Sequence, residues 1–342
     1  MPDVVAVELW LGATAYAVLA GADFGAGFWD LVAGGAARGA RPRALIDRAI
    51  SPVWEANHVW LIFILVVLWT GFPPAFAAIF STLFVPLALA ALGIVLRGAG
   101  FALRHVAERL ELRRALGASF AISSVLTPFF MGTVVGAVVS GRVPADGNGD
   151  RLGSWCNGMS IVVGLLFVAT SAYLAATFLV VDARRTGDAE LEGYFRRRAI
   201  GAGIVAGALA TIGIVVLHED ARYVYDGLTS NGLPLVIVSA LAGIAALVAL
   251  VRGSAVWPRP FAVAAVVAVV WGWGVAQHPY LLPTSLKIDA AAAPHATLVA
   301  LVVVLAAAVL IIGPALGLLY TLHQRSALDE QPPPATAGPG GG

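Results

Sequence analysis

The sequence has few charged side chains and almost no cysteine. Charged residues make up 12% of its 342 positions and apolar residues 59%, whereas a soluble domain carries about 25% charged residues. So few charges cannot cover the surface of a water-soluble protein, and the apolar content excludes a disordered chain. The lone Cys156 can form neither an internal disulfide nor a cysteine-based metal site. A net charge of +1 provides no basic surface that would indicate nucleic acid as a partner.

Long apolar stretches, by contrast, are abundant, and nine of them reach the roughly 20 residues that a transmembrane helix needs. They cover approximately residues 4–33, 53–72, 75–96, 117–140, 157–181, 199–217, 233–251, 260–277 and 296–322. Lipid offers the backbone no hydrogen-bond partner, so each stretch must be helical. Continuous apolar runs do not alternate as the strands of a membrane barrel would. We therefore predict an all-α polytopic membrane protein with nine transmembrane helices.

The predicted organisation along the chain is simple. A single integral membrane domain covers residues 1–325, with helices 1 to 4 at about 1–140, helices 5 to 8 at about 157–277 and helix 9 at about 296–322. Similar short segments at residues 13–16 and 169–173 fit two parallel four-helix units followed by a ninth helix. The segment 326–342, rich in proline and glycine, predicts a disordered cytoplasmic tail.

Basic residues gather on one face of the predicted bundle. With helices alternating in direction, 17 of the 21 basic residues, Arg97 among them, lie on the face opposite the N-terminus. The N-terminal face has only Arg142, Arg151, Arg222 and Lys287. The positive-inside rule then places the N-terminus outside the cell and the C-terminus in the cytoplasm. The first residues lack the basic region of a cleaved signal peptide, so the first helix should remain in the mature protein.

An ionisable side chain inside a membrane span is expensive unless it faces protein, so each one is a functional candidate. The first span contains Asp23, followed by Asp30, which should reach the headgroups. Around Asp23, the segment GADFGAG has three glycines that would let a neighbouring helix approach closely, Gly21, Gly25 and Gly27. Asp23 fits either a packed residue hydrogen-bonded to that neighbour or a group that handles protons, and both interpretations stay open.

The second span has the densest group of polar side chains, in the segment SPVWEANHVWLI. Glu55 and His58 are three residues apart and share a helix face, whereas Asn57 points about 100° away from His58. A carboxylic acid beside an imidazole can pass protons. The structural alternative is a glutamate neutralised by an arginine at the rim, either Arg48 or Arg97. So many polar groups within one and a half turns favour a function over packing alone.

Histidine pairs would be needed to ligate a haem. The chain has six histidines, at positions 58, 105, 218, 278, 295 and 323. His58 has no partner at its depth. Three others, His218, His278 and His295, fall on the N-terminal face and could meet there, although histidines in such places more often face water. We therefore predict that this chain ligates no haem and no other metal.

Five segments together resemble subunit II of the cytochrome bd quinol oxidases. They are residues 21–27 (GADFGAG), 49–62 (AISPVWEANHVWLI), 71–76 (GFPPAF), 93–104 (GIVLRGAGFALR) and 279–285 (PYLLPTS). The helix with Pro-x-Trp-Glu-x-Asn-x-Val-Trp-Leu is the most specific of them, and the hydropathy pattern agrees over nearly the whole chain.

The resemblance implies two four-helix bundles plus one peripheral helix, as a multi-pass protein of the bacterial plasma membrane. It implies a heterodimer with a homologous subunit I, which ligates haem b and haem d and oxidises quinol, with four-electron reduction of oxygen to water. A small accessory membrane subunit, lipid and a bound structural quinone are further expected partners. The roles that it implies for this chain are proton uptake from the cytoplasm, oxygen access and scaffolding of subunit I.

The resemblance also assigns roles to single residues. Glu55 takes the family's acidic position and is the leading proton-path candidate, together with Asn57, His58 and Asp23. Trp60 and the three glycines Gly21, Gly25 and Gly27 match positions of packing or oxygen access, and Trp54 and Arg97 match positions near a structural quinone. Many relatives carry a second acid three residues before Asp23, where this chain has Ala20. A proton route that needs that acid cannot run unchanged here.

Two other functions fit the same polar residues. A proton-coupled secondary transporter would also have acids within its spans, glycines and an internal repeat. A purely structural assembly subunit would tolerate loss of Glu55 and Asp23 as long as its complex forms.

Overall fold

The computed structural model describes residues 1–50, 54–106 and 108–324, which are almost wholly helical. The helices are α1 (Pro2–Leu31), α2 (Ala36–Ile50), α3 (Trp54–Gly71), α4 (Pro73–Thr82), α5 (Phe84–Val106), α6 (Leu110–Val139), α7 (Gly158–Arg185), α8 (Ala189–Asp220), α9 (Arg222–Thr229), α10 (Leu233–Val251), α11 (Pro258–Gln277), α12 (Ile288–Ala291) and α13 (His295–Gln324). Two short antiparallel strands, β1 (Tyr280–Leu282) and β2 (Leu286–Lys287), pair between α11 and α12. The predicted disordered tail lies outside the described residues.

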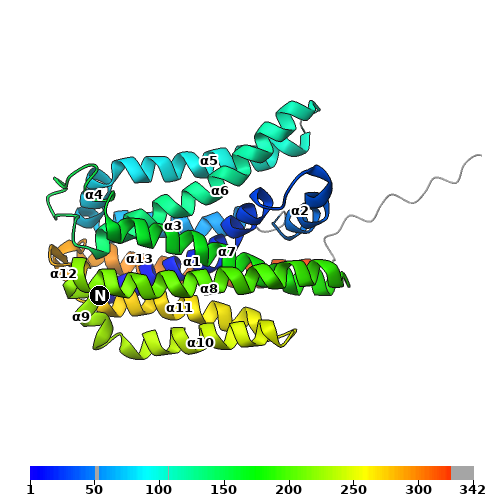
Figure 1. Ribbon diagram of the computed structural model, residues 1–342. Coiled ribbons are helices and arrows are strands. Elements are labelled where there is room, and N and C mark those ends of the chain that lie inside the picture. Colours follow the sequence, from blue (N-terminus) through cyan, green and yellow to red (C-terminus); the bar gives the residue numbers. More distant parts are fainter. Residues whose placement is uncertain (51–53, 107, 325–342) are drawn as a thin grey trace, which may run out of the picture.

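The long helices run side by side between two ends of the molecule (Figure 1). One end, which we call the N-terminal end, has the N-terminus, α4, α9, α12 and the two strands. The other contains α2 and the links between α5 and α6, α7 and α8, and α10 and α11. Most of the arginines lie on α2, in these links or on the parts of the long helices next to them, so we call it the arginine-rich end.

The predicted helical membrane fold is confirmed. Within the described residues, eight helices are long and apolar enough to cross a membrane: α1, α5, α6, α7, α8, α10, α11 and α13. A ninth candidate combines α3 with α4, which is bent away from it by 117°. The third predicted span, 75–96, is wrong in its bounds, because α4 occupies its beginning and the spanning helix α5 starts only at Phe84.

Two prolines explain the break between α3 and α4. Phe72, which precedes Pro73, has backbone angles φ −137° and ψ 60°, outside the helical region. Proline disfavours the helical conformation in the residue before it and is itself well suited to a first helical turn. The chain therefore ends α3 at Gly71 and starts α4 in a new direction with Pro73 and Pro74.

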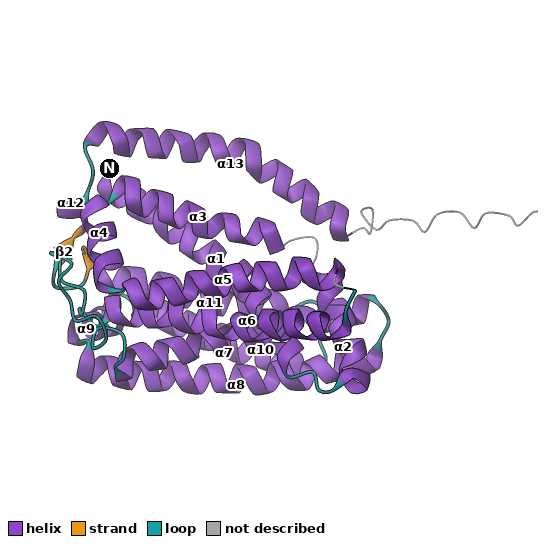
Figure 2. Ribbon diagram, turned by 90° about the horizontal axis from the view of Figure 1, so that it is seen from above, coloured by secondary structure: helices purple, strands orange, loops and turns teal. Residues whose placement is uncertain are grey.

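The helices form two bundles, as predicted. In the first, α1 packs on α3 and α6, and α6 packs on α5; in the second, α7 packs on α8 and α11, and α10 packs on α8 and α11. The central helix is α1, which also packs on α7 and α11. Together with the packing of α6 on α7, it joins the two bundles. Helix α13 lies along one edge, against α1 and α3 (Figure 2), and matches the predicted peripheral ninth helix.

The polar helix α2 was not among the sequence predictions. It follows α1 at the arginine-rich end and packs on α1 and α7. Arg43 holds it in place, since its Nε donates a 2.7 Å hydrogen bond to Asp30 Oδ1 and its Nη2 donates to the main-chain O of Gly34 at 2.6 Å. Asp30 is therefore buried under α2, whereas the sequence placed it among the headgroups.

Candidate functional site

Four charged side chains are buried in the described part of the chain, and all four belong to its first half. They are Glu8, Asp23 and Asp30 of α1 and Arg97 of α5. A buried charge is tolerated when a second charge or a set of hydrogen bonds compensates it. Asp23 and Arg97 meet each other in the interior of the first bundle, and this pair is the centre of the candidate site.

The Asp23 and Arg97 side chains are only 2% and 1% exposed. Arg97 Nη2 lies 2.9 Å from Asp23 Oδ1 and donates a hydrogen bond of the same length to the main-chain O of Asp23. Among the described residues, neither carboxylate oxygen of Asp23 accepts a hydrogen bond beyond this ion pair. The carboxylate is therefore balanced by charge through Oδ1, while the lone pairs of Oδ2 can still accept a proton or a hydrogen bond.

Aromatic and hydroxyl groups complete the surroundings of Arg97. Its Nε donates a 3.0 Å hydrogen bond to Ser124 Oγ of α6. Its guanidinium carbon lies 5.2 Å from the ring centre of Phe24 and 4.8 Å from that of Phe120, so both rings stabilise the cation. The sequence prediction put Arg97 at the rim with the other arginines, which is wrong, because α5 places it inside the bundle.

His58 lies on the neighbouring helix α3, close to the same group. Its ring centre is 5.7 Å from that of Phe24 and 6.3 Å from that of Tyr16. The Phe24 ring is shared with Arg97, whose guanidinium carbon lies 5.2 Å from its centre. The Nδ1 of His58 is buried and has no hydrogen-bond partner in the described structure. An imidazole with an unused nitrogen can accept or release a proton at this depth.

Glu55, Asn57 and Trp54 have a described backbone but lie outside the residues whose side chains are described. Because α3 begins at Trp54, Glu55 belongs to its first turn at the arginine-rich end, and His58 follows three residues later. The backbone thus has the helical spacing that puts Glu55 and His58 on one face. Arg97, one of the two arginines that could neutralise Glu55, pairs with Asp23.

The glycines of α1 lie at helix contacts. A Cβ atom added to Gly25 would come within 1.8 Å of the main-chain O of Ser171 in α7, and one added to Gly27 within 2.2 Å of Ser124 Oγ. Gly21 has more room, since the nearest atom, from Leu174, would be 3.6 Å away. Of the two roles offered for these glycines, the geometry supports packing at Gly25 and Gly27 directly.

Ala20, the position of the missing family acid, is fully buried. With Tyr16 and Phe24 it forms an apolar cluster against which Trp60 of α3 packs. Trp60 therefore fills space beside the candidate site. An acid at position 20 would have extended the polar group toward α3, whereas alanine leaves that wall apolar.

Sequence reasoning missed three residues that matter here. Ser124 accepts a hydrogen bond from Arg97. The sequence feature that could have indicated it is the pair of small hydroxyl residues, Ser123 and Ser124, inside an apolar helix. Tyr16 contacts His58 and had been considered only as part of a repeat. Glu8 is a buried acid of α1 whose Oε2 has no hydrogen-bond partner, and its position inside an apolar span could have revealed it.

Among the described residues, no three His, Cys, Asp or Glu side chains gather where they could hold a metal ion. His218 and His278 of the N-terminal end have separate neighbours, Arg222 and Asp3. For a quinone, Arg97 offers one unpaired donor, Nη1, which suits a carbonyl acceptor but is enclosed by the bundle. With the side chain of Trp54 outside the described part, the quinone site stays a prediction.

Comparison with known proteins shows the family to which the chain belongs. Residues 1–323 match the model of the family described as cytochrome bd terminal oxidase subunit II. The chain is 26% identical over 231 residues to the putative cytochrome bd menaquinol oxidase subunit II of Bacillus subtilis, covering 65% of this chain and 64% of that protein. It is 24% identical over 314 residues to cytochrome bd-I ubiquinol oxidase subunit 2 of Escherichia coli, covering 80% of each. The structure of bd oxidase from Geobacillus thermodenitrificans matches with a TM-score of 0.79 and 25% identity, over 96% of this chain and 99% of that one.

Proposed function

Because the chain belongs to the family of cytochrome bd terminal oxidase subunit II, we propose that it takes up protons for a quinol-oxidising, oxygen-reducing membrane complex. In this proposal, the haem-bearing subunit I supplies the redox chemistry with haem b and haem d. The present chain conducts protons inward from the arginine-rich end and supports subunit I. One relative's name specifies menaquinol and another's ubiquinol, so the proposal leaves the quinol open.

The observation that carries the proposal is the set of unused proton acceptors in the first bundle. Among the described residues, Asp23 Oδ2 is buried without a hydrogen bond while Oδ1 is paired with Arg97, and His58 has a buried nitrogen without a hydrogen bond. Unsatisfied buried polar atoms are costly, so a membrane protein retains them where they serve a function. A proton entering at Glu55, in the first turn of α3, would pass to His58 and then to Asp23.

Arg97 has a defined part in this route. Its guanidinium pairs with the Asp23 carboxylate at 2.9 Å and so holds this proton acceptor in a fixed position inside the bundle. Ser124 and the rings of Phe24 and Phe120 keep the guanidinium in place.

Orientation and oxygen access complete the proposal. The arginine-rich end faces the cytoplasm by the positive-inside rule, which puts Glu55 at the side from which protons are drawn. Oxygen is apolar, so its route through the membrane would follow the apolar clusters of the interior and avoid the Asp23–Arg97 pair.

The test is Glu55→Gln in the purified oxidase, with oxygen consumption measured at saturating quinol. Loss of a positioned proton-transfer group lowers turnover by about 100-fold, whereas haem absorbance should stay at the wild-type level because the complex still assembles. Glu190→Gln is the matched control, since this glutamate is exposed at the same end and pairs with Arg41 on the surface. Full turnover in Glu55→Gln would remove Glu55 from the route and favour a purely structural subunit.

A further inference from the structure

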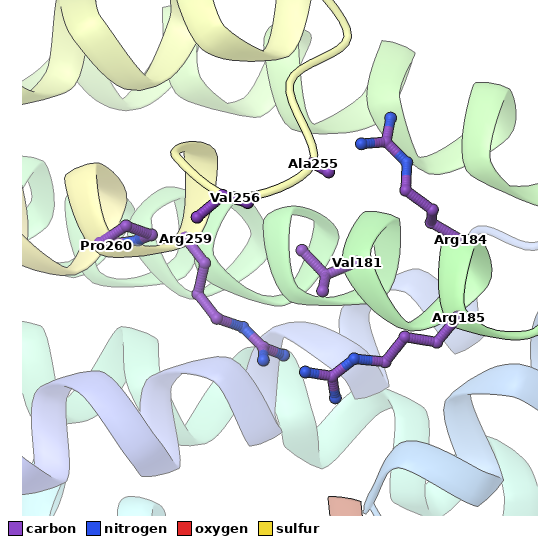
Figure 3. Close-up of a pocket in the computed structure, with 7 residues that line it drawn as sticks. All are labelled: Val181, Arg184, Arg185, Ala255, Val256, Arg259 and Pro260. Atoms are coloured by element: carbon purple, nitrogen blue, oxygen red, sulfur yellow. The ribbon is translucent and has the colours of Figure 1, made fainter.

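A second arginine group lines an open pocket at the arginine-rich end, far along the chain from the Asp23–Arg97 pair. The pocket lies between the end of α7 and the start of α11 and has a volume of about 380 Å³ (Figure 3). Its lining residues are Val181, Arg184, Arg185, Ala255, Val256, Arg259 and Pro260.

Positive charge exceeds negative charge around this pocket. Arg184 is satisfied, because it binds both carboxylate oxygens of Glu192 and donates to the main-chain O of Gly253 at 3.0 Å. Arg185 and Arg259, in contrast, share one oxygen of Asp182, at 3.9 Å and 3.6 Å. Three guanidinium groups therefore face two carboxylates, and the two contacts to Asp182 are longer than hydrogen bonds.

The two loosely held arginines point toward each other across the pocket floor (Figure 3). Arg259 lies over the ring of Phe178, 4.3 Å from its centre, which fixes the direction of its guanidinium. Its Nε is buried and lacks a hydrogen-bond partner within the described part of the chain. Two converging guanidinium groups, each with several N–H donors, are the arrangement that binds an anion with several oxygens, such as a phosphate.

The remaining walls of the pocket are apolar and lie where two spans end. Val181 ends the apolar part of α7, and Ala255, Val256 and Pro260 lead into α11. Val256 is 68% exposed, and the adjacent Trp257 is exposed as well. Tryptophan favours the level of the lipid headgroups, so the pocket opens at the membrane surface, where acyl chains can lie along its rim.

We propose that this pocket binds the phosphate headgroup of an anionic phospholipid. Arg185 and Arg259 donate to the phosphate oxygens, and the phosphate reduces the repulsion between these two cations. Asp182, between them, cancels one of the two charges, which leaves the pair with one uncompensated positive charge for a monoanionic headgroup. The acyl chains extend from Val256 and Trp257 into the surrounding bilayer. Basic pockets between helices at a membrane surface bind anionic lipid headgroups in this manner.

The experiment is native mass spectrometry of the full chain, purified in mild detergent with its accompanying subunits and titrated with phosphatidylglycerol or phosphatidylcholine. The expected result for the wild type is preferential retention of phosphatidylglycerol. Arg185→Gln should weaken that retention about fivefold, the usual contribution of one arginine near an anionic lipid. Its side chain is half exposed, so this variant should fold normally.

Two further variants serve as controls for this experiment. Arg197→Gln, at an exposed position of α8 outside the pocket lining, is the matched control and should keep the wild-type preference. Arg259→Lys keeps the charge but loses the planar fork, and should bind phosphatidylglycerol more weakly than the wild type. Equal retention of both lipids, or unchanged retention in Arg185→Gln, would overturn the proposal. Displacement of phosphatidylglycerol by millimolar inorganic phosphate would also overturn it, because the pocket would then select free phosphate.

Discussion

The two bundles differ in what they bury. The first, built from α1, α3, α5 and α6, has charged side chains in its interior. The interior of the second, built from α7, α8, α10 and α11, is apolar apart from hydroxyl and amide groups. Among the described residues, every buried charged side chain belongs to α1 or α5. The second bundle buries residues such as Tyr173, Leu174 and Phe195, and its arginines stay near the arginine-rich end. Since a buried charge must be compensated, this difference indicates that the first bundle is suited to handling charge and the second to packing.

The largest expected effect comes from removing one partner of the buried pair. Arg97→Met leaves the Asp23 carboxylate enclosed without a counter-charge, which costs about 3–5 kcal/mol. The measurement is thermal unfolding of the purified protein in detergent. The double variant Asp23→Asn/Arg97→Met should recover part of the loss because no charge is left unpaired, and Arg197→Met, at an exposed position, should behave as wild type. Equal melting temperatures for Arg97→Met and Arg197→Met would contradict the claim that the first bundle depends on a buried ion pair.

The next effect concerns the contact of α1 with α7, one of the contacts between the two bundles. Gly25→Ala places a methyl group within 1.8 Å of a main-chain oxygen of α7, so the helices must separate, at a cost of about 1–3 kcal/mol. Gly21→Ala, one helical turn away, has 3.6 Å of room and should be neutral or slightly stabilising, since alanine favours helix. Thermal unfolding of the two variants side by side measures the difference. Equal stability would mean that the packing of α1 against α7 is looser than described.

A smaller effect tests whether polar groups of the second bundle are dispensable. The Tyr173 hydroxyl is buried in α7, and no described residue forms a hydrogen bond with it. Tyr173→Phe removes this unpaired group and keeps the ring, so stability should change by less than about 0.5 kcal/mol. Oxygen consumption should stay at the wild-type rate. A marked loss of turnover would mean that the second bundle also takes part in the chemistry, contrary to the difference described above.

The smallest effect is a pH dependence confined to the rim of the second bundle. Hydrogen bonds from the main-chain N–H of Leu191, and then from Arg41, lower the pKa of Asp188, which caps α8. A lowered pKa in the folded state means that Asp188 stabilises the protein above about pH 4 and that this contribution disappears as the pH falls through the folded-state pKa. Asp188→Asn should flatten the acid side of a melting-temperature profile. Unfolding profiles that coincide from pH 3 to 7 would contradict this expectation.

Particular residues show how far the sequence could lead. Asp23 and His58 were recognised as candidates because a polar side chain inside an apolar helix is costly wherever its neighbours lie. Arg97 was assigned to the rim because it falls close to a basic loop, and only the packing of α5 on α6 reveals that it reaches α1. The break at Phe72 had a local signal in the two prolines that follow, but the apolar run across it concealed the change of direction.

The sequence by itself determined the helical membrane fold, the family and the end at which the arginines gather. These properties are local, since each span must satisfy its own backbone hydrogen bonds in lipid and each motif is a continuous segment. Tertiary structure alone decided that Asp23 meets Arg97, 74 positions along the chain, and that Arg185 meets Arg259 across a pocket. Such pairings depend on how each helix is rotated about its axis and which helix lies beside it, and that is set by side-chain packing over the whole bundle.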